Sequence, residues 1–474
     1  MTQKVSPLTA SKPHILIIIA RGEAVRNFLY SETLPALREK ARVTLLSAIN
    51  DEAFLARVRS QVDEIIELKD YPESKLIGFL RELIAYAHYR WLWTEKVKNK
   101  WHILDSQVVT PSHKVRHAIW KALIFILANR PALSALTWLE NRLTLWLNPT
   151  RDFDDLFARL QPDLVFNASH IHAPRGELPV RVAHQRGIRT AAFIFSWDNL
   201  SSRGRILPHY DDYLVWHRDM RDELLRLYPD LAPERVHITG TPQFDFHFRP
   251  AFCLPREELC AHLGLDPARP FVLYTTGMDR DFPEEVRHVR AIIGILDQAE
   301  GPRKTQLVVR VYVKGTSPEM MALSHERIPN VIFPPILWEE KWFTPHYDDL
   351  AIYSSLLHHC ALGINPASTV SLELMMLDKP VVNLGFDPPG SRIPPGFGWK
   401  RHIEFDHYRR VVASGAVTVA RSMADVEHAI RRDLSDPTAL SAKRRAFIQQ
   451  TFGETLDGES GRRVAEKLVE IVAR

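Results

Sequence analysis

A short stretch near the end of the chain, Asn365 to Leu384 (NPASTVSLELMMLDKPVVNL), carries side chains suited to binding an anion and a sugar. Its small polar turn offers the hydroxyls of Ser368 and Thr369 directly before an apolar, helix-like segment. Free backbone N–H groups and the dipole at the start of a helix attract phosphate. Glu373 lies one turn further on, where its carboxylate could accept hydrogen bonds from vicinal hydroxyls such as those of a ribose. The alternative is that one hydroxyl only caps the helix and that Glu373 is a solvated first-turn acid.

Other polar side chains follow strand-like segments. Thr275, Thr276 and Gly277 end the run FVLYTTG, and Arg310 ends the run QLVVR. Because ligands of open α/β sheets bind at the carboxyl ends of the strands, these residues are expected to line one wall with the anion-binding turn. Arg310 would neutralise a phosphate there and stabilise its departure. Its alternative role is a surface ion pair.

Candidate proton acceptors follow two earlier strand-like segments. Asp198 comes after TAAFIF, and His170 and His172 come after DLVFNAS. An aspartate is the better base when burial raises its pKa, and the neighbouring Trp197 is expected to contribute to that burial. A histidine needs less adjustment. The alternatives are that Asp198 only forms a turn and that the two histidines only support other groups.

The elements that must position these residues form two α/β series. Apolar runs alternate with helical segments from His14 to about residue 245, and again from Phe271 to Ala420. This alternation predicts βαβ units and doubly wound parallel sheets. A proline-rich segment, RPAFCLPREELCAHLGLDPARP, separates the two series. For a chain of 474 residues we therefore predict a first domain over residues 1–250 and a second over 251–474.

Residues 81–147 do not fit the alternation and predict a helical insertion in the first domain. They hold six of the 11 tryptophans. From Arg81 to Arg130, nine Lys or Arg residues face three acidic ones, and the cations include Lys96, Lys98, Lys100, Lys114, Arg116 and Lys121. Apolar stripes at helical spacing are Trp120, Leu123, Ile124 and Leu127, then Leu133, Leu136, Leu143 and Leu147. Such stripes form a packed core or dock on a membrane. Because tryptophan and basic residues favour anionic bilayer surfaces, we expect membrane docking.

Composition excludes several classes of protein. The net charge of +4 is too small to indicate a nucleic-acid-binding protein. The three cysteines form no disulfide framework or zinc pattern. Lys4 and Lys12 precede only the short run Ile15–Ala20, which predicts a strand rather than a signal peptide. No apolar run reaches the roughly 18 residues of a membrane span. The dinucleotide-binding glycine fingerprint and the P-loop are absent.

Four segments resemble the GT-B glycosyltransferase superfamily, near CDP-glycerol glycerophosphotransferases and UDP-N-acetylglucosamine 2-epimerases. ITGTPQFD (Ile238–Asp245) resembles the Gly-x-Pro-x-x-Asp element that ends their first domain, and FVLYTTG resembles the opening strand of their second. VVRVYVKG (Val308–Gly315) resembles their Arg-x-His-Pro strand. The stretch from Asn365 to Val382 resembles their donor-phosphate helix. In addition, FSWDNLSSRGRI (Phe195–Ile206) resembles a segment of bacterial surface-polysaccharide glycosyltransferases.

Two positions depart from the pattern of these families. Pro366 stands where an aspartate is usual, which weakens any detailed transfer from the epimerases. Tyr312 and Val313 replace the His-Pro pair after Arg310, which counts against a phosphotransferase mechanism that relies on that histidine.

The resemblance implies a GT-B fold, with two Rossmann-like, doubly wound parallel-sheet domains facing a cleft. The first domain would bind the acceptor and the second the nucleotide donor, and the last helix would pack back on the first domain. We expect a glycosyltransferase of bacterial cell-surface glycan biosynthesis that uses no metal or other cofactor. Its partners would be a nucleotide-sugar donor, a glycan or lipid-linked acceptor and an anionic membrane surface, but no nucleic acid. It would be cytoplasmic and peripheral on the inner membrane.

Three alternatives stay open: a CDP-alditol polyol-phosphate transferase, a UDP-sugar 2-epimerase-like isomerase and a non-catalytic glycan-binding protein. The aromatic, basic insertion favours the two transferases, because an epimerase handles small, freely diffusing substrates. The missing histidine after Arg310 favours the glycosyltransferase of the two.

Overall fold

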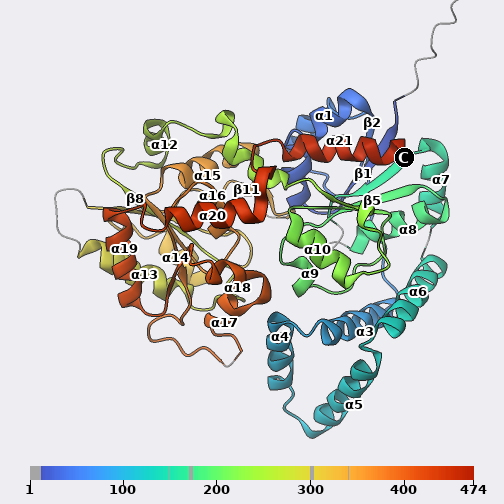
Figure 1. The fold of residues 1–474 in the computed structure, drawn as a ribbon, viewed down its shortest axis with the longest axis horizontal. Helices are drawn as coiled ribbons and strands as arrows, with labels where there is room; N and C mark the ends of the chain where they lie inside the picture. Colours follow the sequence, from blue (N-terminus) through green and yellow to red (C-terminus); the bar gives the residue numbers. More distant parts are fainter. Residues whose placement is uncertain (1–11, 149, 170–173, 299–303, 340, 395) are drawn as a thin grey trace, which may run out of the picture.

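The computed structural model describes residues 12–148, 150–169, 174–298, 304–339, 341–394 and 396–474. Two parallel sheets, of seven and six strands, lie side by side with helices around them (Figure 1). A helical arm extends below the first sheet in this view. The predicted fold class, two doubly wound α/β parts with a helical insertion in the first, is confirmed.

The first sheet has the strand order β3-β2-β1-β4-β5-β6-β7. Its strands are β1 (His14–Ile19), β2 (Arg42–Ser47), β3 (Glu64–Glu67), β4 (Leu164–Asn167), β5 (Arg189–Phe193), β6 (Asp212–Val215) and β7 (Val236–Ile238). All six residues of β1 are buried, as expected for a central parallel strand covered on both faces. The strand order reverses between β1 and β4, which opens a crevice at the carboxyl ends of these strands.

The second sheet has the order β10-β9-β8-β13-β14-β15. Its strands are β8 (Phe271–Thr275), β9 (Gln306–Arg310), β10 (Val331–Ile332), β13 (Leu362–Asn365), β14 (Val381–Leu384) and β15 (Thr418–Ala420). Each coincides with an apolar run of the sequence. A separate antiparallel pair joins β11 (Trp338–Glu339) to β12 (Thr344–Pro345).

Helices surround both sheets. Those that follow the strands of the first sheet are α1 (Thr33–Lys40), α2 (Glu52–Arg59), α7 (Arg151–Leu160), α8 (Glu177–Gln185), α9 (Asn199–Ser202), α10 (Arg218–Leu227), α11 (Pro242–Asp245) and α12 (Arg256–Leu263). A single turn of π-helix, Val25–Leu29, follows β1. The later helices are α13 (Glu285–Asp297), α14 (Pro318–Ser324), α15 (Tyr347–His359), α16 (Val370–Met376), α17 (Lys400–Glu404), α18 (Asp406–Ala413), α19 (Met423–Ser435), α20 (Ser441–Phe452) and α21 (Ser460–Ala473).

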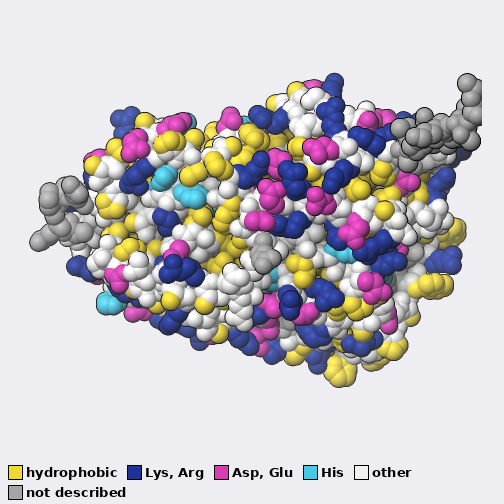
Figure 2. All heavy atoms as spheres, turned by 45° about the horizontal axis from the view of Figure 1, so that its top comes forward, with side chains coloured by type: hydrophobic (Ala, Val, Ile, Leu, Met, Phe, Trp, Pro, Cys, Tyr) yellow, Lys and Arg dark blue, Asp and Glu magenta, His cyan; other side chains and the backbone are white. Residues whose placement is uncertain are grey.

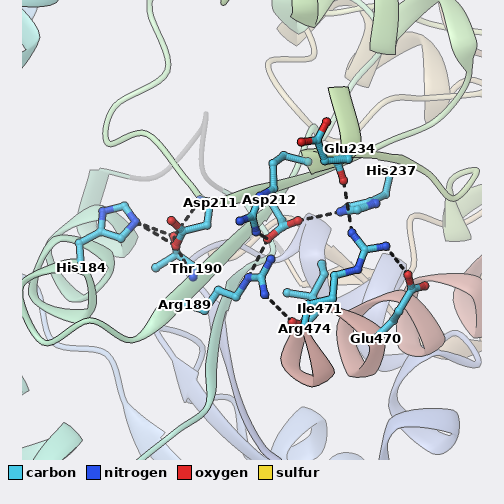
Figure 3. A network of polar contacts seen from close by, with 11 residues as sticks. His184, Arg189, Thr190, Asp211, Asp212, Glu234, His237, Glu470, Ile471 and Arg474 are labelled. Carbon is cyan, nitrogen blue, oxygen red and sulfur yellow. Dashed lines mark hydrogen bonds and ion pairs between the residues drawn. The ribbon is translucent and has the colours of Figure 1, made fainter. Parts of the chain in front are cut away.

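The last helix, α21, crosses back from the second sheet and packs against α1 (Figure 1). A polar network at the amino ends of β5, β6 and β7 fixes it there (Figure 3). Asp212 accepts hydrogen bonds from Arg189 Nε at 3.0 Å, Arg235 Nη1 at 3.2 Å and His237 Nε2 at 2.8 Å. Arg189 also donates to the carbonyl of Ile471 in α21 at 2.8 Å. The chain end is therefore part of the first sheet's layer.

The insertion consists of α3 (Lys75–Leu92), α4 (Glu95–Ser106), α5 (Pro111–Leu127) and α6 (Arg130–Leu147). Charges, rather than apolar side chains alone, anchor α6 to α3 and α8. The buried Glu140 accepts from Arg81 Nε at 2.7 Å and from Arg181 Nη2 at 2.9 Å. Glu177 pairs with the same two arginines at 3.0 and 3.5 Å. Two cations and two acids thus compensate each other, as a buried charge cluster requires.

None of the described helices is by itself long and apolar enough to cross a membrane. Helices α5 and α6 reach the required length and composition only together, and they meet at an angle of 103°.

Candidate active site

The carboxyl ends of strands from the two sheets meet through direct side-chain contacts. Trp197, after β5, donates from Nε1 to Oγ1 of Thr369, after β13, at 3.2 Å. Lys314, beyond β9, forms an ion pair with Glu23, beyond β1. A cavity of about 330 Å³ lies between α10 of the first domain and α18 of the second. The residues predicted to bind a ligand therefore come from two domains that are already in contact.

The small polar turn before α16 is organised by Asn365. Its Oδ1 accepts hydrogen bonds from the backbone N of Ser368 at 3.3 Å and from the Ser368 hydroxyl at 3.2 Å. Thr369 occupies the N-cap position, but its side chain makes no capping hydrogen bond. Its hydroxyl instead meets Trp197 across the cleft. The two hydroxyls are thus engaged in shaping the turn and in joining the domains, not in capping the helix.

Arg310 and Glu373 come together on either side of Tyr353. Arg310 Nη2 lies 2.6 Å from Asp349 Oδ2, and its guanidinium carbon is 4.8 Å from the centre of the Tyr353 ring. The Tyr353 hydroxyl donates to Glu373, which also lies 3.4 Å from His247 Nε2. Burial, followed by the charge of Glu373, raises the pKa of Tyr353 well above its usual value. Glu373 is thus buried and bonded within the protein, rather than standing on the surface of a first turn.

The segment after β8 is held mainly by backbone contacts. Thr276 Oγ1 accepts a hydrogen bond from the backbone N of Tyr312 at 2.8 Å, which links the ends of β8 and β9. The backbone N of Gly277 donates to both carboxylate oxygens of Glu285, at 3.1 and 3.0 Å. Burial raises the pKa of Glu285 to about 8, although these hydrogen bonds lower it. Thr275 is buried, and its hydroxyl has no hydrogen-bond partner among the described residues.

The sequence analysis did not predict that cations of the first domain lie near the donor-binding residues of the second. Arg26, in the π-helical turn after β1, donates to Gln243 at 2.9 Å and has no carboxylate within ion-pair distance in the described part of the chain. Burial lowers the pKa of Lys314 while Glu23 raises it, and the charges of Arg21 and Arg26 lower it again. Positive side chains of both domains therefore gather at one place. The run ARGEAVR directly after β1, with two arginines at the carboxyl end of a strand, could have indicated these cations in the sequence.

Asp198 lies where three parts of the molecule meet. Lys96 of the insertion donates from Nζ to Asp198 Oδ2 at 3.0 Å, and the hydroxyls of Ser196 and Ser202 donate at 2.6 and 2.8 Å. Burial raises the pKa of Asp198, but Lys96, His407 and the Ser196 hydroxyl together hold it well below the usual value. The predicted rise of this pKa is wrong, because the insertion supplies a cation that the sequence pattern assigned to the surface.

His407, in α18, is a candidate proton acceptor that the sequence analysis missed, since it follows no strand and belongs to no motif. Its ring meets the Trp197 ring edge-on at 5.1 Å. Its Nδ1 is buried without a hydrogen-bond partner among the described residues. Burial lowers the pKa of His407 to about 4 although Asp198 raises it, so the imidazole is neutral at neutral pH. It lines the 330 Å³ cavity together with Trp197 and Arg410. The other two candidates, His170 and His172, lie outside the described residues.

No protein-family model and no curated protein sequence matches the chain. Solved structures match it over nearly its whole length. A UDP-N-acetylglucosamine 2-epimerase structure is 13% identical over 98% of this chain and 97% of its own, with a TM-score of 0.52. The enzyme of Neisseria meningitidis, solved bound to UDP-GlcNAc, is 10% identical over 97% and 100%, with a TM-score of 0.52. That of Rickettsia bellii is 11% identical over 98% and 96%, with a TM-score of 0.51.

The protein has the GT-B fold. At these identities the likeness extends to the fold and not to the reaction. The first sheet provides Asp198, and the second provides Arg310 and the turn with Ser368 and Thr369. The two sheets meet where Trp197 donates to Thr369. Among the described residues, no three His, Cys, Asp or Glu side chains are grouped so that they could hold a metal ion.

Proposed function

We propose that this protein is a glycosyltransferase that moves a sugar from a nucleoside-diphosphate donor to a hydroxyl of an acceptor in bacterial cell-surface glycan assembly. The observation that supports the proposal is the meeting of the two sheets at Trp197 and Thr369. Cations of both domains lie on one side, and Asp198 and His407, which influence each other's pKa, lie on the other. Such a transfer needs a proton acceptor, a charge to stabilise the departing diphosphate, and a cleft that holds both substrates.

The donor binds mainly to the second domain. Ser368 and Thr369 would donate to the diphosphate, and Arg310 would neutralise the charge that develops as the sugar–phosphate bond breaks. Arg26 and Lys314 add positive charge from both sides of the cleft. Thr275, Thr276 and Gly277 form the backbone wall of this site, and Glu373 fixes Tyr353 beneath Arg310.

The acceptor hydroxyl loses its proton to His407, which lies in the electrostatic field of Asp198. The hydroxyl oxygen then bonds to the anomeric carbon, and the bond from that carbon to the diphosphate breaks. A neutral imidazole accepts a proton more readily than a carboxylate of depressed pKa, so His407 is the proton acceptor and Asp198 stabilises the imidazolium. His170 and His172 follow the neighbouring strand and remain candidates for contacting the acceptor.

The insertion favours a transferase over a UDP-sugar epimerase, because an epimerase has no second substrate to receive. A CDP-alditol transferase would use the same cleft, but the Tyr312–Val313 pair after Arg310 lacks the histidine of that family's pattern.

The test begins with calorimetric titration of UDP, CDP, GDP and TDP into the full chain. The nucleotide that binds is then supplied as nucleotide-sugars and, for CDP, as CDP-alditols, with candidate glycan acceptors. Release of nucleoside diphosphate with growth of the acceptor supports glycosyl transfer, and release of the monophosphate indicates polyol-phosphate transfer. Inversion at C2 of the sugar without release indicates an epimerase. If no nucleotide binds at millimolar concentration, the proposal fails.

A further inference from the structure

The buried face of helix α6 carries mostly polar side chains, while its exposed face carries two tryptophans. Leu133, Thr137, Glu140 and Thr144, spaced along one face, are buried. On the other face, Trp138 and Trp146 are 62% and 79% exposed. This is the reverse of the usual surface helix, whose apolar stripe faces the core. The charges that anchor α6 thus leave its two tryptophans largely exposed, with Arg142 lying over the Trp138 ring at 5.7 Å.

The same reversal extends over the insertion. Thirteen of the fifteen large hydrophobic side chains that are exposed in the described residues lie between Leu76 and Leu147, and the other two are Ile238 and Ile336. In α5, Val115, Ile119, Phe125 and Ile126 are each more than 60% exposed. Figure 2 shows hydrophobic side chains at the lower and right margins of the molecule, where Figure 1 places α5 and α6. Concentrated exposure of this kind marks an interaction surface.

The charge of the exposed surface on α5 and α6 indicates what kind of partner would bind it. No acidic residue occurs from Ser106 to Leu139, while Lys114 and Arg116 stand exposed among the apolar side chains of α5. Tryptophans at the rim of an apolar face, flanked by basic residues, are typical of helices that lie in the interface of an anionic bilayer. The 103° bend and the buried Glu140 favour lying along the surface over crossing it.

The lysines of α4, which the sequence analysis included in this surface, are engaged within the protein. Lys96 binds Asp198, Lys98 pairs with Glu95 at 2.7 Å, and Lys100 lies 4.1 Å from the centre of the Tyr89 ring. The surface therefore consists of α5 and α6, and α4 faces the cleft.

A cavity of about 520 Å³ lies between α6 and the rest of the first domain. Arg130 and Trp138 of α6 line it, and Arg205 lines the opposite side. Arg205 donates to Thr137 at 3.0 Å and lies over the Tyr228 ring at 5.2 Å. Neither Arg130 nor Arg205 has a carboxylate within ion-pair distance among the described residues. Two such guanidinium groups suit a phosphate group, and Asp230 also lines this cavity.

We propose that the insertion docks the protein on an anionic lipid bilayer, with the exposed apolar side chains of α5 and α6 in the interface and the phosphate of a lipid headgroup between Arg130 and Arg205. This docking is independent of the reaction proposed above. It would bring the cleft close to the bilayer, because α4 of the same insertion supplies Lys96 to Asp198.

The test is flotation of the full chain with phosphatidylcholine vesicles and with vesicles that also contain phosphatidylglycerol, at low and high salt. We expect binding only to the anionic vesicles, weakened by salt. Trp138→Ser with Trp146→Ser should lower the affinity at least about tenfold, as should Lys114→Glu with Arg116→Glu. The matched controls, Ile336→Ser and Arg421→Glu with Lys443→Glu, change exposed residues outside the insertion and should bind as wild type does.

Arg130→Gln with Arg205→Gln tests the headgroup site, and we expect about a tenfold loss of affinity for anionic vesicles. Arg130→Gln alone, at an exposed residue, keeps the test valid if the double variant is unstable by circular dichroism. The proposal is overturned if wild type does not float with anionic vesicles at low salt, or if the tryptophan variant floats equally well. Dimerisation in sedimentation velocity that disappears in the tryptophan variant would assign the face to a second copy of the chain instead.

Discussion

Two aspartates at opposite ends of the first sheet have contrasting surroundings. Asp212, at the amino end of β6, is fully buried, and its partners Arg189, Arg235 and His237 all come from the edge of that sheet (Figure 3). Asp198, at the carboxyl end of β5, has a side chain that is 19% exposed. Its neighbours Lys96 and His407 come from the insertion and from the second domain.

The difference separates a structural charge cluster from a site. Both aspartates are bound by cations, so a buried ion pair alone does not indicate function. The network of Asp212 is local and fixes the last helix on the sheet. The network of Asp198 draws on three separate parts of the molecule and adjoins a cavity, so a ligand could change it. The same substitution at both positions should therefore have different effects.

Asp212→Asn should give the largest loss of stability. It removes the counter-charge of Arg189 and Arg235 while both stay in place, and breaking a buried pair in this way costs about 3–5 kcal/mol. Urea unfolding at pH 7.5 measures the loss, and donor affinity of the folded fraction should not change. Glu427→Gln, which breaks the exposed pair with Arg431, is the control and should cost less than about 0.5 kcal/mol. If Asp212→Asn lowers the free energy of unfolding by less than about 1 kcal/mol, Asp212 does not have the structural role that distinguishes it from Asp198.

Asp198→Asn should act on turnover instead. The variant keeps the shape of the side chain and removes the charge that would stabilise an imidazolium at His407, so we expect about a 100-fold slower transfer, or about 2.7 kcal/mol on the barrier. The measurement is nucleoside-diphosphate release at saturating donor, with stability followed in parallel. A variant that transfers at the wild-type rate, or that unfolds as readily as Asp212→Asn, would contradict the assignment of Asp198 to the site.

The fold was largely predictable because buried parallel strands read as continuous apolar runs. Strands such as β8 follow directly from such patterns. The edge strand β3 was not predicted, since its sequence EIIE has only two apolar residues and resembles a loop. The local sequence pattern was therefore sufficient to predict those strands that are covered on both faces of the sheet.

The site was predictable only where one strand end determines it. Arg310 and Thr369 were assigned to one wall because both follow strands of the same sheet. Lys96 was assigned to the membrane surface, although it binds an aspartate 102 residues away. His407 gave no signal, because its importance arises from packing against Trp197 and not from its own neighbours in sequence. Such contacts depend on how the domains and the insertion meet, which no local pattern contains.

Ser368→Ala with Thr369→Ala tests the cleft on its donor side. Loss of two hydroxyl donors to a charged group should weaken nucleoside-diphosphate binding by about 1–3 kcal/mol in calorimetry. The control at the structural end of the first sheet is Thr190→Val, which removes a hydroxyl bound to Asp211 at 2.9 Å. That variant should lose stability and keep its donor affinity. Equal donor affinity in wild type and the Ser368/Thr369 variant would mean that the turn serves only to join the domains.

The smallest expected effect distinguishes the histidines of the two networks. His237 is hydrogen-bonded to Asp212, whereas His407 is buried without a partner for Nδ1, and its pKa falls from 6.5 to about 4. The unfolded chain therefore binds a proton between these values that the folded chain rejects, so stability is lost as pH falls through this window. From pH 7.5 to 5.5, His407 should account for a loss of about 1.4 kcal/mol in the free energy of unfolding.

His407→Gln removes this titration while keeping a polar side chain of similar size. Urea unfolding at pH 7.5 and pH 5.5 should show a smaller decline for the variant than for wild type, by about 1.4 kcal/mol. The comparison between two pH values cancels any constant effect of the substitution on packing. Equal declines in the two proteins would mean that His407 is already protonated, or well solvated, at pH 5.5. It would then be a charged neighbour of Asp198, and the neutral proton acceptor of the site would have to be sought elsewhere.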